Sequence, residues 1–93
     1  MNEARIYEKL ESLRESYLDD LPMPKNESDV ELDGQMFTQR VWTEPHENGK
    51  LVVFMFESNK IIYSKAFCLG LKINENGAAE NLSNEQLWDI GIP

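Results

Sequence analysis

The sequence predicts an α+β domain: an N-terminal helix, a four-stranded antiparallel β-meander and a short C-terminal helix. Three observations support this class. Apolar residues recur with helical spacing near the N-terminus, hairpin turn signals recur through the middle, and capping signals surround residues 84–90. The 93 residues fit a single domain spanning 1–93, because domains usually contain about 50–250 residues.

The first helix is expected over residues 3–21. Its apolar side chains recur after four, three and four residues, which places them on one helix face: Ile6, Leu10, Leu13 and Tyr17. Charged residues occupy the positions between them. The helix is expected to end before Pro22, because the residue preceding a proline is disfavoured in the α conformation.

Three turn signals divide the middle of the chain: Asp33-Gly34, Asn48-Gly49 and Ser58-Asn59. The first two are typical of two-residue hairpin turns, which need positive φ at both central positions. The intervening segments are rich in Val, Ile, Phe, Tyr and Trp, as strands are. The sequence therefore predicts strands at 28–32, 35–45, 50–57 and 60–73.

The second helix is expected over residues 84–90. Ser83 and Gln86 have the spacing of a capping box, in which each side chain bonds the other residue's backbone N–H. Trp88 and Ile90 are expected to dock this helix on the rest of the domain.

A two-residue turn at Asn48-Gly49 would fix the register of the central hairpin. It places Trp42 opposite Met55, and Arg40 opposite Glu57 as a favourable cross-strand charge pair. The other turns, treated in the same way, add the pairs Val30–Phe37, Phe56–Ile61 and Phe54–Tyr63.

This register gives the sheet two faces. The first is large and apolar: Val30, Leu32, Phe37, Val41, Val52, Phe54, Phe56, Ile61, Tyr63, Phe67, Leu69, Leu71 and Ile73. The second is mixed, with an apolar centre of Trp42, Val53, Met55 and Ile62. A three-residue loop at 58–60 would swap the faces of the last strand. Either a partner, the helix at 84–90 or the loop at 22–28 could cover the apolar centre.

Composition argues against several classes of function. The net charge of −8 opposes binding to nucleic acid and to anionic membrane surfaces. The single cysteine, Cys68, and the lack of a signal-peptide pattern favour the cytoplasm.

His46 is expected in an exposed turn. Asp29–Gly34 resembles the start of a calcium loop but has Arg40 at the twelfth position, where a glutamate is required. No catalytic, cofactor or metal site is expected.

The preferred hypothesis is therefore a non-enzymatic interaction module, a homodimer formed through the second sheet face or the last strand. Its contact centre would be Trp42, Met55, Val53 and Ile62, with Arg40 at the rim. One alternative is a small protein that binds an apolar ligand between the sheet and the first helix, in a pocket lined by Tyr17, Phe54, Tyr63 and Phe67. Another is an acidic inhibitor or immunity-type protein that binds a basic protein.

Overall fold

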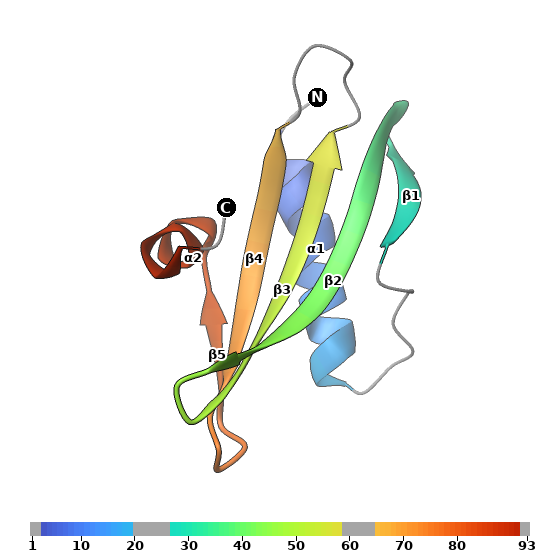
Figure 1. The fold of residues 1–93 in the computed structure, drawn as a ribbon. Coiled ribbons are helices and arrows are strands. Elements are labelled where there is room, and N and C mark those ends of the chain that lie inside the picture. Colours follow the sequence, from blue (N-terminus) through green and yellow to red (C-terminus); the bar gives the residue numbers. More distant parts are fainter. Residues whose placement is uncertain (1–2, 20–26, 59–64, 92–93) are drawn as a thin grey trace.

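The computed structural model describes residues 3–19, 27–58 and 65–91. The elements follow the order α1 (Glu3–Leu18), β1 (Glu27–Leu32), β2 (Gln35–His46), β3 (Gly49–Ser58), β4 (Ala66–Ile73), β5 (Ala79–Leu82) and α2 (Asn84–Ile90). The strands form one antiparallel sheet in chain order, with α1 and α2 on opposite faces (Figure 1). The predicted α+β class is confirmed, with five strands in place of four.

The helix α1 covers the first face of the sheet with the predicted apolar stripe. Ile6 and Leu10 are buried against the aromatic side chains of β3 and β4. The rings of Tyr17 and Phe54 meet edge to face with centroids 6.0 Å apart. The helix ends at Leu18, three residues before the predicted end. This helix and sheet form the larger of the two apolar cores.

The β2–β3 turn lies one residue earlier than predicted, with Glu47 and Asn48 at its centre. Glu47 has a positive φ of 51°, whereas the prediction gave positive φ to Asn48 and Gly49. Gly49 is instead needed where β3 approaches the end of β4, because a Cβ at this position would collide with the carbonyl oxygen of Ile73. Trp42 consequently faces Val53, and its predicted pairing with Met55 is wrong.

The predicted partners of Arg40 also change. Arg40 lies opposite Met55, yet its guanidinium still reaches Glu57 diagonally, with Nη1 at 2.9 Å from Oε1. The register between β2 and β3 differs from the prediction by two residues. Because side chains alternate along a strand, an even shift leaves every residue on its predicted face. The Val30–Phe37 pair on β1 and β2 is confirmed.

The last predicted strand is shorter and paired differently. It begins at Ala66, and Phe56 faces Phe67, so the predicted pairs of Phe56 with Ile61 and of Phe54 with Tyr63 are wrong. Two bonds close the connection from β3: Ser58 N–H donates to the Lys65 carbonyl oxygen, and Lys65 N–H donates to Ser58 Oγ. This shift is even as well, so Phe67 stays on the first face and Cys68 on the second. Ile62 and Tyr63 lie outside the described residues.

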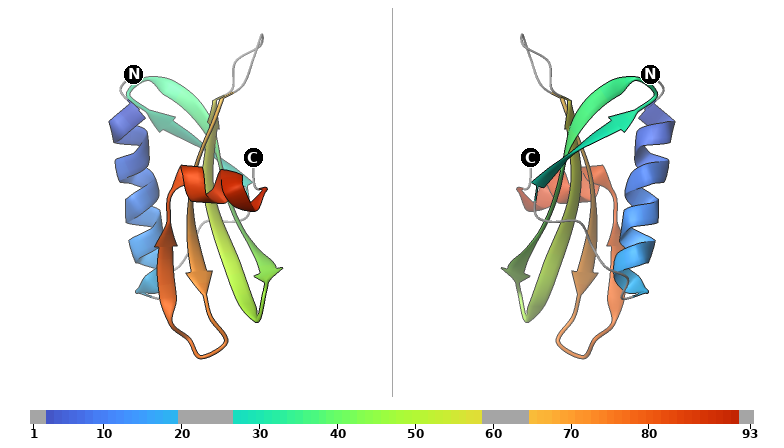
Figure 2. Two further views of the ribbon diagram at one scale, coloured as in Figure 1. Left: turned by 90° about the vertical axis from the view of Figure 1, so that its left-hand side faces the viewer. Right: turned by 90° about the vertical axis from the view of Figure 1, so that its right-hand side faces the viewer.

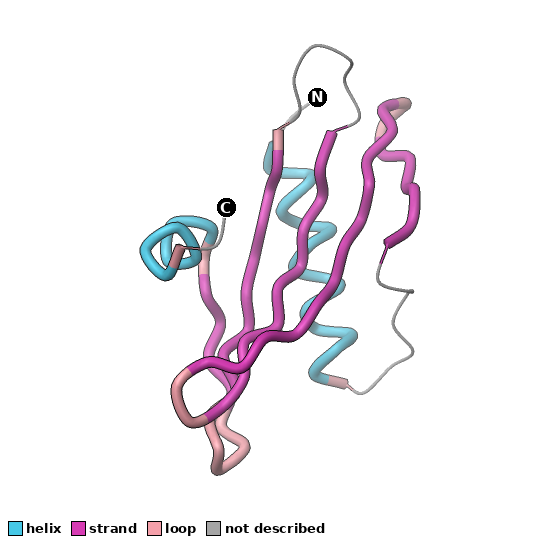
Figure 3. The backbone as a smooth tube through the Cα atoms, in the orientation of Figure 1, coloured by secondary structure: helices cyan, strands magenta, loops and turns pink. Residues whose placement is uncertain are grey.

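The strand β5 was not predicted, and it changes which strands form the edges of the sheet. It pairs with the second half of β4, from Gly70 opposite Leu82 to Ile73 opposite Ala79. Residues 70–73 of β4 are therefore paired on both sides, and β1 and β5 are the outermost of the described strands (Figure 3).

The helix α2 has the predicted N-terminal cap but docks through a different residue. Ser83 and Gln86 form the capping box, with donor–acceptor distances of 2.8 and 3.2 Å. Leu87 is buried, whereas Trp88 is 64% exposed and Ile90 is 40% exposed. Gly70 explains this choice, because a Cβ there would come within 2.7 Å of Leu87 Cδ2. The bare glycine leaves the space that Leu87 fills, so the prediction that Trp88 and Ile90 dock the helix is wrong.

Candidate functional site

The centre of the second sheet face is covered by the chain itself. A second apolar cluster joins α2 to this face: Leu51, Val53, Met55, Cys68, Leu82 and Leu87, with Trp42 and Ala66 partly buried beside it. Val53 has no exposed surface and Met55 is 8% exposed. These two residues of the predicted contact centre are therefore unavailable to a partner in this structure.

Trp42 and Arg40, the other predicted interface residues within the described part of the chain, lie at the border of this cluster. Trp42 is half-buried, and its indole N–H donates to Glu44 Oε1 at 3.1 Å. Arg40 is half-buried between Glu57 and Glu27, and its hydrogen bond to Glu57 holds its pKa above the usual value. Both polar groups are thus satisfied within the chain.

Three of the four residues predicted to line an apolar pocket pack against other side chains: Tyr17, Phe54 and Phe67. Tyr17 contacts Phe54, and Tyr7 contacts Phe67 with ring centroids 5.9 Å apart. Phe54 and Phe67 are both buried in the core below α1. These contacts pack the described part of the helix directly on the sheet, and Tyr63, the fourth predicted lining residue, lies outside the described residues.

The largest exposed apolar side chain is on α2. Successive residues of a helix point about 100° apart, so Trp88 and Ile90 project on either side of the buried Leu87. Ile90 lines a groove with Leu82 and Gln86, bordered by the side chains of the β2–β3 turn and of β5. Figure 2 shows α2 crossing the sheet on the face opposite α1. We call Trp88, Ile90, Glu85, Asp89 and Glu80 the α2 surface.

The α2 surface is strongly acidic. Residues 73–93 contain Glu75, Glu80, Glu85 and Asp89 but no Lys, Arg or His. All four carboxylates are exposed, and none forms an ion pair within the described ranges. Two cations lie nearby: Lys72 Nζ is 3.2 Å from Glu47 Oε2, and Arg14 Nη1 donates to the carbonyl oxygens of Gly70 and Leu82 at 3.3 Å. Neither forms an ion pair with the four carboxylates, so the exposed tryptophan lies among acidic side chains without an ion-pair partner in the described residues.

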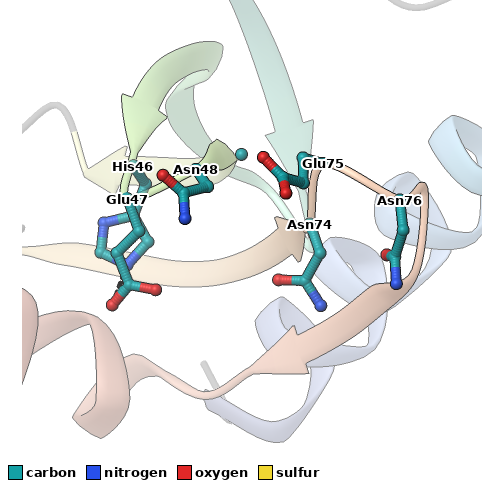
Figure 4. Close-up of a pocket in the computed structure, with 7 residues that line it drawn as sticks. His46, Glu47, Asn48, Asn74, Glu75 and Asn76 are labelled. Atoms are coloured by element: carbon teal, nitrogen blue, oxygen red, sulfur yellow. Dashed lines mark ion pairs between the residues drawn. The ribbon is translucent and has the colours of Figure 1, made fainter.

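A polar groove lies between the β2–β3 turn and the β4–β5 turn (Figure 4). His46 and Glu47 line one side, and Asn74, Glu75 and Asn76 line the other. His46 Nε2 lies 3.8 Å from Glu47 Oε1, which is beyond hydrogen-bond distance. The groove therefore lacks the oriented base and adjacent nucleophile that covalent catalysis needs.

The single cysteine is also unsuited to nucleophilic chemistry. Burial raises the pKa of the Cys68 thiol from 9.0 to about 11, and the carboxylate of Glu57 adds to the shift. The reactive form of a cysteine is the thiolate, so this environment suppresses reactivity. Over residues 3–19, 27–58 and 65–91, no three His, Cys, Asp or Glu side chains are grouped closely enough to hold a metal ion.

Comparison with protein-family models, curated proteins and solved structures finds no match for the chain. No helix in the described part of the chain is both long and apolar enough to span a membrane. The centre of the second sheet face and the core below α1 are filled by side chains in the described part of the chain, which leaves the α2 surface as the exposed apolar feature with uncompensated charge. Sequence reasoning missed the α2 surface. Two signals for it were present: a strand glycine, Gly70, which marks close approach, and the acidic run after Lys72.

Proposed function

We propose that this protein is a non-enzymatic interaction module that binds a basic protein through the α2 surface. The observation that carries the proposal is Trp88, 64% exposed on a helix whose position is fixed by its neighbour Leu87. Tryptophan is among the residues most enriched at binding hot spots. A large aromatic side chain that is exposed on an anchored helix is suited to fill a pocket on a partner.

The charge around Trp88 selects the partner. Glu85 and Asp89 lie one turn apart on α2, and Glu80 of β5 lines the same groove as Asp89, so a partner with Lys or Arg around an apolar pocket would be complementary. A standard interface buries about 800 Å² on each partner, about an eighth of the 6038 Å² surface of this chain. Such an area extends from α2 onto the adjacent turns of β2–β3 and β4–β5.

A homodimer, which the sequence predicts at the second sheet face or the last strand, would use the α2 surface less well. Two copies meeting at α2 would bring their carboxylates together, and like charges repel most at low salt. Self-association at this surface should therefore strengthen as salt rises, whereas binding of a basic partner should weaken. Light scattering of the purified protein distinguishes them: we expect the 10.8 kDa monomer mass at low salt. A stable dimer at low salt would favour self-assembly.

The partner can be sought by affinity capture from an extract of the source cells at low salt. Wild type is compared with Trp88→Glu and with Leu18→Glu, a matched change at an exposed apolar residue of α1. The wild type and Leu18→Glu should retain a basic protein that elutes with salt, and Trp88→Glu should lose it. Equal capture by all three chains would contradict the α2 surface as the binding site.

A further inference from the structure

The outer edge of β1 is a second surface suited to binding, at the opposite end of the sheet from α2. Among the described strands, β1 pairs with β2 alone, and its other edge has no strand beside it (Figure 1). The outward backbone N–H and C=O groups of an edge strand can bond an added strand. Extended peptides bind many domains in this way, with specificity set by alternate side chains.

Side chains of β1 alternate sharply between the two faces. Glu27, Asp29 and Glu31 are exposed on one face, whereas Val30 and Leu32 are half-buried on the other. Glu27 is already engaged by Arg40. Asp29 and Glu31 form no ion pair among the described residues, so two carboxylates lie two residues apart on the same face of β1 without a paired cation.

A groove lies on the apolar side of this edge. Leu32 lines it together with Arg5, Glu8, Lys9 and Ser12 of α1. Arg5 is bound to Asp33 at the end of β1, with Nε at 3.1 Å from Oδ2, which ties α1 to the β1–β2 turn. A strand added to β1 would place alternate side chains over Leu32 and into this groove, and the others beside Asp29 and Glu31.

We infer that β1 accepts an extended segment of another protein that alternates apolar residues with Lys or Arg. The apolar residues would cover Val30 and Leu32, and the basic residues would pair with Asp29 and Glu31 across the new strand. A second copy of β1 does not fit, because antiparallel pairing of two such strands places carboxylates opposite carboxylates. The carboxylates of Asp29 and Glu31 therefore favour basic residues on their face of the added strand and oppose self-pairing.

The test uses the full ¹⁵N-labelled chain and two synthetic seven-residue peptides, one alternating lysine with valine and one alternating glutamate with valine. The lysine peptide should shift the amide signals of residues 27–32 and slow hydrogen exchange at alternate amides among them. The glutamate peptide should do neither. Asp29→Lys combined with Glu31→Lys should reverse this preference by at least tenfold, while the matched pair Glu11→Lys and Glu15→Lys on α1 should preserve it.

Three results would overturn the inference: no binding of the lysine peptide at millimolar concentration, binding without added exchange protection in β1, or binding unchanged by the charge reversal at Asp29 and Glu31. If the reversed chain does not fold, Asp29→Asn with Glu31→Gln should weaken the lysine peptide several-fold, and no change would count against the site. Trp88→Glu should leave peptide binding unaffected, so the outcome is separable from that of the α2 surface.

Discussion

Replacing Leu87 with alanine should release α2 from the sheet. Leu87 is fully buried and is the single buried residue of a seven-residue helix. Isolated helices shorter than about 12–15 residues are marginal in water, so α2 depends on this contact. Truncation of a buried leucine to alanine costs about 2–5 kcal/mol. Since about 1.4 kcal/mol changes an equilibrium tenfold, the open population should rise by roughly 30-fold or more.

Cys68 reports this opening. Its side chain is 1% exposed in the cluster that Leu87 covers, and its backbone N–H donates to Asn84 Oδ1 of α2 at 3.3 Å. Release of the helix should therefore expose the thiol to Ellman's reagent. At constant pH under native conditions, we expect Leu87→Ala to label at least roughly 30-fold faster than wild type.

The matched control is Trp88→Ala, which truncates a larger but exposed side chain on the same helix. Substitutions at such positions usually change stability by less than about 0.5 kcal/mol, so labelling of Cys68 should stay within about a factor of two. Equal labelling rates for wild type and Leu87→Ala would show that Leu87 does not hold α2 in place. Faster labelling in Trp88→Ala than in Leu87→Ala would show that Trp88, and not Leu87, docks α2 on the sheet.

Three further predictions concern stability, measured by urea unfolding. Phe54→Ala removes a fully buried ring below α1 and should cost about 3–5 kcal/mol; a loss below about 1 kcal/mol would contradict the packing. Arg40→Ala breaks half-exposed ion pairs and should cost about 1 kcal/mol or less, with a smaller effect in 1 M salt. The Cys68 thiol has a higher pKa folded than unfolded, so its stabilisation is complete below pH 9 and declines as pH rises to about 11. Cys68→Ala should flatten this decline, and identical slopes would refute the shift.

Local signals in the sequence predicted the helices well, because periodicity and capping depend on residues close together in the chain. The faces of the described strands were also predicted correctly, although two registers were not. Both errors were even in residue number, which preserves alternation. The turn predicted at Asn48-Gly49 was misplaced because Gly49 is required for another reason. Its missing Cβ lets β3 approach the carbonyl oxygen of Ile73, 24 positions away in the chain.

Two features that matter for the site depend on tertiary contacts. The strand β5 has the sequence Ala-Glu-Asn-Leu, which carries little intrinsic β preference, and its conformation comes from pairing with β4. The docking residue of α2 is chosen by the space over Gly70, and hydrophobicity alone would have placed Trp88 inside. As a result, α2 covers Val53 and Met55 of the predicted contact centre, and the exposed tryptophan, Trp88, lies on α2 itself.

The most direct measurement is the exposure of each tryptophan in the free protein. The chain has two, so Trp42→Phe leaves Trp88 and Trp88→Phe leaves Trp42 as the only indole fluorophore. With Trp88 exposed and Trp42 half-buried beside the second cluster, acrylamide should quench Trp88 severalfold more efficiently than Trp42. Equal quenching, or stronger quenching of Trp42, would show that α2 does not present Trp88 to a partner.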